Sequence, residues 1–140
     1  MSIDEITEFV ESLGGVLTLT PEPGDGTPEL AWGDRFFYYS PDGVLPPGQP
    51  FATIVTKDYP DEPAVGLGVG VFRVNVDAGL RGQAPVVDPA RPDVVQPHPA
   101  YGGIGWVAVV APGERTADEL PRLLREAHAA AKRRWERRRS

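Results

Sequence analysis

The sequence predicts an α+β domain in two layers, in which an antiparallel sheet of about five strands is packed by an N-terminal helix and a C-terminal helix. Apolar residues recur at helical spacing near both ends of the chain, and short β-rich runs fill the part between them. Short turns rich in glycine and proline separate these runs and favour antiparallel pairing. The 140 residues suffice for one domain with a core. We expect this domain at residues 1–135, followed by a basic tail at 136–140.

The first helix is predicted over residues 3–13. Ser2 and Glu5 form a capping-box pattern, in which each side chain accepts a hydrogen bond from the backbone N–H of the other residue. Gly14 and Gly15 end the helix, because glycine adopts the left-handed conformation at little cost. The apolar stripe consists of Ile3, Ile6, Val10 and Leu13.

Five extended segments follow and give the order α-β-β-β-β-β-α. Proline and glycine in the turn at residues 41–43 separate the second segment from the third. Residues 78–92 show no periodicity and are expected to form an exposed loop. The segments are residues 16–20, residues 29–40 with a turn or bulge at Gly33 and Asp34, residues 51–59, residues 71–76 and, as the last strand of the sheet, residues 106–110.

The closing helix has an apolar stripe formed by Leu120, Leu123, Leu124, Ala127 and Ala131. Its start lies between residues 116 and 118 and stays open. Thr116 and Glu119 resemble a capping box, but that start would place Pro121 beyond the first turn, where its ring clashes with the preceding turn. A start at Asp118 would place Pro121 in the first turn.

Composition excludes several classes of protein. The chain has no cysteine, so disulfides and thiolate metal sites are excluded. The acidic N-terminus lacks the pattern of a signal peptide, and no apolar run is long enough to span a membrane, so we expect a soluble cytoplasmic protein without membrane contact. Residues 1–63 carry twelve acidic and two basic side chains, a net charge of −10, which repels phosphate polymers.

His98, between Pro97 and Pro99, is the most suggestive single residue. It is a candidate catalytic general base, with Tyr101 or Asp58 as partner. The alternative is that His98 pins its loop to the sheet through a hydrogen bond to a carbonyl. Asp58, Asp61, Glu62 and His98 together resemble no known pattern of metal ligands, so we expect no metal and no cofactor.

A ligand pocket is predicted on one face of the sheet. The successive aromatic residues 36–39 cannot all face the core, because side chains alternate along a strand. Some aromatic surface therefore lines a cleft. The candidate ligand-binding residues are Tyr38, Lys57, Arg73, His98 and Tyr101.

The basic end of the closing helix permits two interpretations. Positive charge at a helix C-terminus is favourable in itself. It could also contact nucleic acid, with Trp135 stacking on a base. The residues of this alternative are Lys132, Arg133, Arg134, Trp135, Arg137 and Arg138.

Several segments follow one another in a distinctive order, among them IDEITEFVESLGGV, PFATIVTKDYP, GVFRVNV, HPAYGGIGWVAVVAPGERT and LLREAHAAAKRR. In this order the chain resembles an uncharacterised actinobacterial family, the domain-of-unknown-function family numbered 6194. More distantly, the layout looks like the YjbR/MmcQ "double-wing" group, which implies an antiparallel sheet with terminal helices and suggests DNA binding by analogy of fold. The resemblance implies no catalytic residues.

Together these observations predict a small non-catalytic module that binds an unknown small molecule or protein. One alternative is a DNA-binding protein of the YjbR/MmcQ type that uses the basic C-terminal helix. The other is a small enzyme with His98 as general base.

Overall fold

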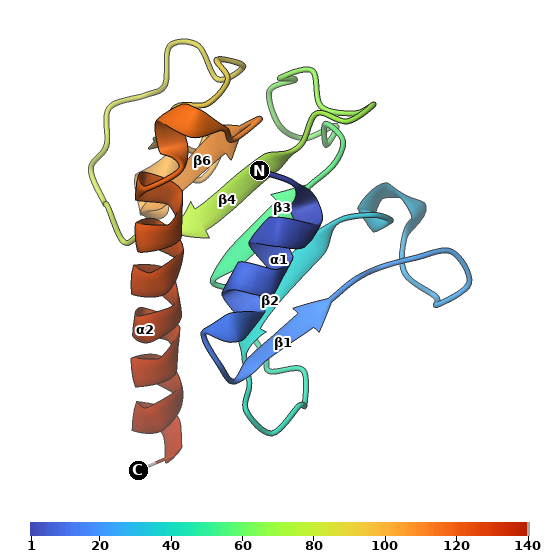
Figure 1. Ribbon diagram of the computed structural model, residues 1–140, viewed down its shortest axis with the longest axis vertical. Helices are drawn as coiled ribbons and strands as arrows, with labels where there is room; N and C mark the ends of the chain where they lie inside the picture. Colours follow the sequence, from blue (N-terminus) through green and yellow to red (C-terminus); the bar gives the residue numbers. More distant parts are fainter. Residues whose placement is uncertain (140) are drawn as a thin grey trace.

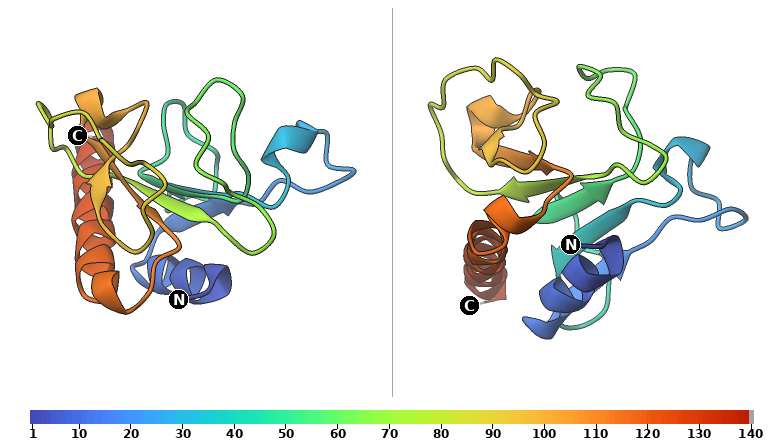
Figure 2. Two further views of the ribbon diagram at one scale, coloured as in Figure 1. Left: turned by 90° about the horizontal axis from the view of Figure 1, so that it is seen from above. Right: turned by 45° about the horizontal axis from the view of Figure 1, so that its top comes forward.

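The computed structural model describes residues 1–139, and within them an open six-stranded antiparallel sheet carries two α-helices on one face (Figures 1 and 2). The helices are α1, Ile3–Ser12, and α2, Glu119–Arg139. The strands are β1 (Val16–Leu19), β2 (Arg35–Tyr39), β3 (Ala52–Val55), β4 (Arg73–Asp77), β5 (Gln96–Pro97) and β6 (Trp106–Val110). Their spatial order is β1-β2-β3-β4-β6-β5. The predicted α+β architecture is confirmed.

The core lies between the helices and the sheet. Alternate strand residues point toward the helices and are fully buried there, among them Phe37 of β2, Ile54 of β3 and Val74 of β4. The predicted stripe of α2 packs against them, and its first member, Leu120, is also fully buried. The residues between them on each strand therefore point to the opposite face.

Both helices begin close to the predicted positions. In α1 the capping box of Ser2 and Glu5 is present. Helix α2 begins at Glu119, just after the predicted interval, so Pro121 lies in its first turn. Thr116 does not cap it, because Thr116 ends the 3-10 helix Glu114–Thr116 and does not directly precede Glu119; its hydroxyl donates to the carboxylate of Asp93.

Three expectations about the strands were wrong. Residues 29–31 form a short 3-10 helix rather than a strand. The expected strand at 51–59 extends only from Ala52 to Val55, because the Asp34 carboxylate accepts hydrogen bonds from both the backbone N–H and the hydroxyl of Thr56, each at 2.8 Å. Alternation along the expected strand had predicted Phe51, Thr53, Val55 and Lys57 on one face, but Phe51 packs in the core beside Ala52.

The sheet has six strands instead of about five, because β5 pairs with β6 and forms the edge. The strand that carries Trp106 is the last strand in chain order, as expected, but it lies second from the edge of the sheet and not at its end. The N–H of His98 continues the pairing by donating to the carbonyl oxygen of Trp106 at 3.0 Å. A two-residue strand that contains proline has no periodicity to detect.

The loop at residues 78–92 has no helix or strand, as expected. The side-chain amide of Gln83 ties it to the β6 region by donating to the carbonyl oxygens of Gly102 and Trp106, both at 3.1 Å. Gly105 lies against the start of this loop with φ +105°, and a Cβ there would come within 3.0 Å of the Gly79 Cα. Neither helix of residues 1–139 is long and apolar enough to cross a membrane.

Candidate functional site

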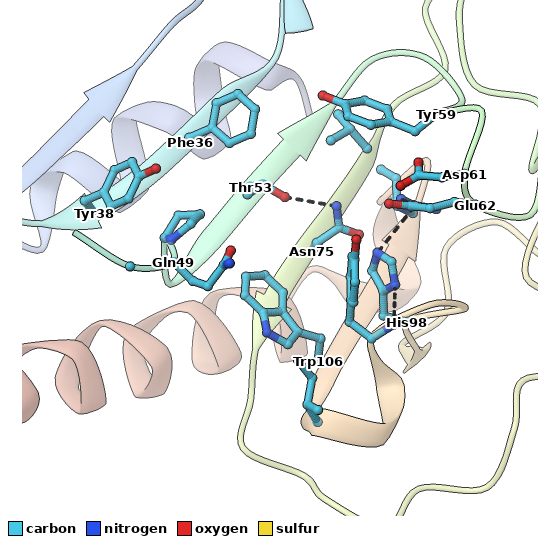
Figure 3. A pocket seen from close by; sticks show the side chains of 16 residues that line it. Phe36, Tyr38, Gln49, Thr53, Tyr59, Asp61, Glu62, Asn75, His98 and Trp106 are labelled. Carbon is cyan, nitrogen blue, oxygen red and sulfur yellow. Dashed lines mark hydrogen bonds and ion pairs between the residues drawn. The ribbon is translucent and has the colours of Figure 1, made fainter. Parts of the chain in front are cut away.

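A cavity of about 480 Å³ lies on the face of the sheet opposite the helices (Figure 3). This volume is in the range of small-molecule sites. The lining residues are Phe36, Tyr38, Gly48, Gln49, Pro50, Thr53, Val55, Tyr59, Asp61, Glu62, Arg73, Asn75, His98, Tyr101, Ile104 and Trp106. Figure 3 shows Phe36 and Tyr38 on one side, Tyr59, Asp61, Glu62 and His98 on the other, and Thr53 and Asn75 between them.

Strand alternation supplies the floor of the cavity. Phe36 is registered with Thr53, Thr53 with Asn75, and Val55 with Arg73, so these five side chains from β2, β3 and β4 share one face. The same alternation that sends Phe37, Ile54 and Val74 into the core thus builds the cavity.

Two carboxylates, those of Asp34 and Asp58, hold the loop between β3 and β4, and this loop forms one side of the cavity. Asp34 accepts from the Tyr59 hydroxyl at 2.5 Å. Asp58 accepts backbone N–H groups from Val65, Gly66 and Leu67 at 2.9–3.2 Å. This loop carries Asp61 and Glu62 to the cavity.

Four of the five predicted pocket residues line the cavity: Tyr38, Arg73, His98 and Tyr101. Lys57 does not. Its Nζ donates to the carbonyl oxygens of Leu30 and Trp32, at 2.8 and 2.6 Å, and lies 4.0 Å from the Asp34 carboxylate. Lys57 therefore holds the 3-10 helix against the end of β3, outside the cavity.

Arg73 and Glu62 form a buried ion pair in the cavity wall. Arg73 Nη2 lies 2.8 Å from Glu62 Oε1, with side chains 4% and 10% exposed. His98 Nε2 lies 3.8 Å from the same oxygen. The carboxylate thus neutralises a guanidinium that would otherwise be buried as an isolated charge.

His98 is held as a neutral hydrogen-bond donor. Its Nδ1 accepts backbone N–H groups from Ala100 and Tyr101, both at 3.0 Å. The ring proton of the neutral imidazole is therefore on Nε2, toward Glu62. Burial, and then the charge of Arg73, lower the pKa of His98 to about 3. A general base needs a free lone pair, and in this tautomer Nδ1 is engaged and Nε2 carries the proton.

The low pKa of His98 predicts a pH dependence of stability. The unfolded chain takes up a proton near pH 6.5, whereas the folded state stays neutral down to about pH 3. Stability should therefore fall as the pH is lowered through this interval, by up to about 1.4 kcal/mol per pH unit from this residue. The measurement is urea unfolding between pH 6.5 and 4.5, compared with His98→Asn, in which this part of the slope should vanish. An imidazole NMR signal of His98 that titrates near pH 6.5 in the folded protein would contradict the assignment.

Two buried polar atoms of cavity-lining residues have no hydrogen-bond partner anywhere in residues 1–139: Arg73 Nε and Asn75 Oδ1. The amide nitrogen of Asn75 donates to the Thr53 hydroxyl at 3.0 Å, which leaves its oxygen unpaired. Buried groups of this kind are rare in folded proteins, because each costs the desolvation of a polar atom. Asn75 had not been predicted as a site residue, although a polar residue in the middle of the strand pattern VFRVNV is a visible signal.

The rest of the lining is aromatic and weakly acidic. Asp61 and Glu62 each carry a negative charge and Arg73 carries a positive one, so the net charge of the lining is −1, because His98 is neutral. Burial raises the pKa of Tyr38, so its hydroxyl stays protonated. Such a cavity is unfavourable for anions and suits uncharged aromatic molecules.

Of the four residues weighed as metal ligands, Asp61, Glu62 and His98 line the cavity and Asp58 does not. Asp58 is committed to the three backbone N–H groups of its own loop. Across residues 1–139, no three His, Asp or Glu side chains are grouped so that they could hold a metal ion.

The basic end of α2 is exposed at Lys132, Arg133, Arg134, Arg137 and Arg138. Trp135 is engaged, because its ring packs edge-on against Tyr39 at 6.1 Å and carries the Arg139 guanidinium 4.1 Å from its centroid. Arg139 also pairs with Asp42 at 3.0 Å. The boundary of the predicted tail falls inside α2, and Ser140 lies outside the described residues.

A family model described as "Family of unknown function (DUF6194)" matches residues 1–140. No curated protein and no solved structure shows significant similarity to the chain. The distant resemblance to the double-wing group stays an expectation.

Proposed function

We propose that this chain is a non-catalytic module that binds a small, planar, uncharged molecule in the cavity over β2, β3 and β4. The chain belongs to the DUF6194 family, which has no assigned function. The observation that carries the proposal is the pair of unsatisfied buried atoms, Arg73 Nε and Asn75 Oδ1, on two residues that line an aromatic-rich cavity. A cavity of this size with a few fixed polar groups is what a ligand site requires.

The aromatic side chains support a planar ligand. Phe36 and Tyr38 from β2 and Trp106 from β6 border the same space (Figure 3). Aromatic faces favour stacked or edge-on contacts with another ring. The two carboxylates support an uncharged ligand, because an anion in the cavity would face a net negative wall.

The state of His98 supports binding over catalysis. Its Nε2–H can donate to a ligand acceptor, but the imidazole has no lone pair available to accept a proton from a substrate. This favours the binding module over the enzyme with His98 as general base. The nucleic-acid alternative rests on the charge of the exposed α2 residues, while Trp135 is packed against the domain.

The test uses three planar probes of closely similar size: benzamide, acetophenone and benzoate. We expect millimolar benzamide or acetophenone to shift NMR signals of residues around Trp106, and benzoate at equal concentration to shift none. Trp106→Leu should abolish the effect, whereas Trp135→Leu, which changes a tryptophan on α2, should not. A benzoate response as strong as that of the neutral probes, or neutral-probe shifts that avoid the cavity, would contradict the proposal.

A further inference from the structure

Arg73 and Asn75 lie two residues apart on β4 and face the cavity together. Residues at this spacing project from the same face of a strand, with their Cα atoms about 6.6–7 Å apart. Each leaves one buried atom without a partner among the described residues. Arg73 Nε–H can only donate, and Asn75 Oδ1 can only accept. Two neighbouring residues of the cavity floor therefore carry one unmet donor and one unmet acceptor.

Contacts at the far end of each side chain hold both in place. The guanidinium of Arg73 is anchored through Nη2 to Glu62, at 2.8 Å. The amide of Asn75 is anchored through Nδ2 to the Thr53 hydroxyl, at 3.0 Å. Neither residue is more than 3% exposed. Fixed groups of this kind discriminate between ligands, because a ligand that lacks a matching group leaves them unpaired.

From this arrangement we infer the chemical group that the cavity recognises: a neutral carboxamide or lactam on a planar ring, with its carbonyl oxygen on Arg73 Nε–H and its N–H on Asn75 Oδ1. The inference rests on the proposed function and names the ligand class for that site. A carboxylate lacks the N–H and carries the charge that Asp61 and Glu62 oppose. A ketone lacks the N–H alone.

The experiment compares benzamide with acetophenone, in which a methyl group replaces the amide nitrogen. Since an unmet buried acceptor weakens binding substantially, we expect wild type to bind benzamide about tenfold more tightly than acetophenone in NMR titrations. In the double variant Asn75→Leu with Thr53→Val, which replaces both hydrogen-bond partners by apolar groups of similar shape, this preference should disappear. Its Tm should be equal to or higher than that of wild type, because an unsatisfied buried oxygen is removed.

The matched control is Gln83→Leu. Gln83 is also an amide, but it lies outside the cavity lining and both of its hydrogen bonds are made, to the carbonyl oxygens of Gly102 and Trp106. This variant should have a lower Tm and an unchanged preference for benzamide.

Equal affinity of wild type for the two probes, or a preference for benzamide that survives in the double variant, would overturn the inference. If both probes bind in the cavity with equal affinity, the proposed function stands and the amide specificity is wrong. If neither probe binds there, both are wrong.

Discussion

Glu62→Ala is expected to lower the free energy of unfolding by about 3–5 kcal/mol, because it leaves the Arg73 guanidinium buried without a counter-charge. Arg73 and Glu62 are 4% and 10% exposed in their side chains, so water cannot readily replace the lost carboxylate. Urea unfolding followed by tryptophan fluorescence measures the loss. It should appear as a lower midpoint with a similar slope.

Two further variants distinguish a charge effect from a packing effect. Glu62→Gln keeps the shape and one acceptor for Arg73 Nη2, so its loss should be smaller than that of Glu62→Ala. The double variant Glu62→Ala with Arg73→Met should recover most of the stability, because a buried ion pair can often be replaced by apolar groups at little cost. A loss below about 1 kcal/mol in Glu62→Ala would mean that this pair contributes no more than an exposed ion pair, and would contradict the prediction.

Phe37→Ala should destabilise the domain by about 3–5 kcal/mol, whereas Phe36→Ala should cost clearly less. The two residues are adjacent on β2 and identical in chemistry, but Phe37 is fully buried in the core and Phe36 is partly exposed on the cavity face. A cavity opened at Phe37 would be enclosed by β3 and the helices, while the space left by Phe36 joins one that already exists.

Parallel urea titrations of the two variants check this prediction. Phe36→Ala should also weaken the binding of benzamide. Equal losses of stability would mean that the cavity face supports the fold as much as the helix-covered face does, and would contradict the division of the sheet into two faces.

Both helices were predictable because their signals are local. The capping box of Ser2 with Glu5 and the stripe that begins at Leu120 are visible within a few turns. Strand β5 was not predictable, because Gln96 and Pro97 are extended only through pairing with the distant β6. The end of β3 likewise depends on a contact across the chain, between Asp34 and Thr56.

The same distinction applies to the cavity. Tyr38 and Arg73 could be predicted as residues of one cavity, because strand alternation alone sends both away from the core. The prediction that Lys57 lines the cavity was wrong, because it extended that alternation past Val55, where β3 ends. Glu62 could not be assigned as the partner of Arg73, because the loop that positions it is folded around the distant Asp34 and its own Asp58.

The edge strand β5 also limits how copies of the chain can associate. The N–H of His98 points inward to Trp106, so the backbone nitrogen of Pro97 points outward, by the alternation of an antiparallel pair. A proline nitrogen has no hydrogen to offer an incoming strand. At this border the sheet therefore resists edge-to-edge pairing with another copy of the chain.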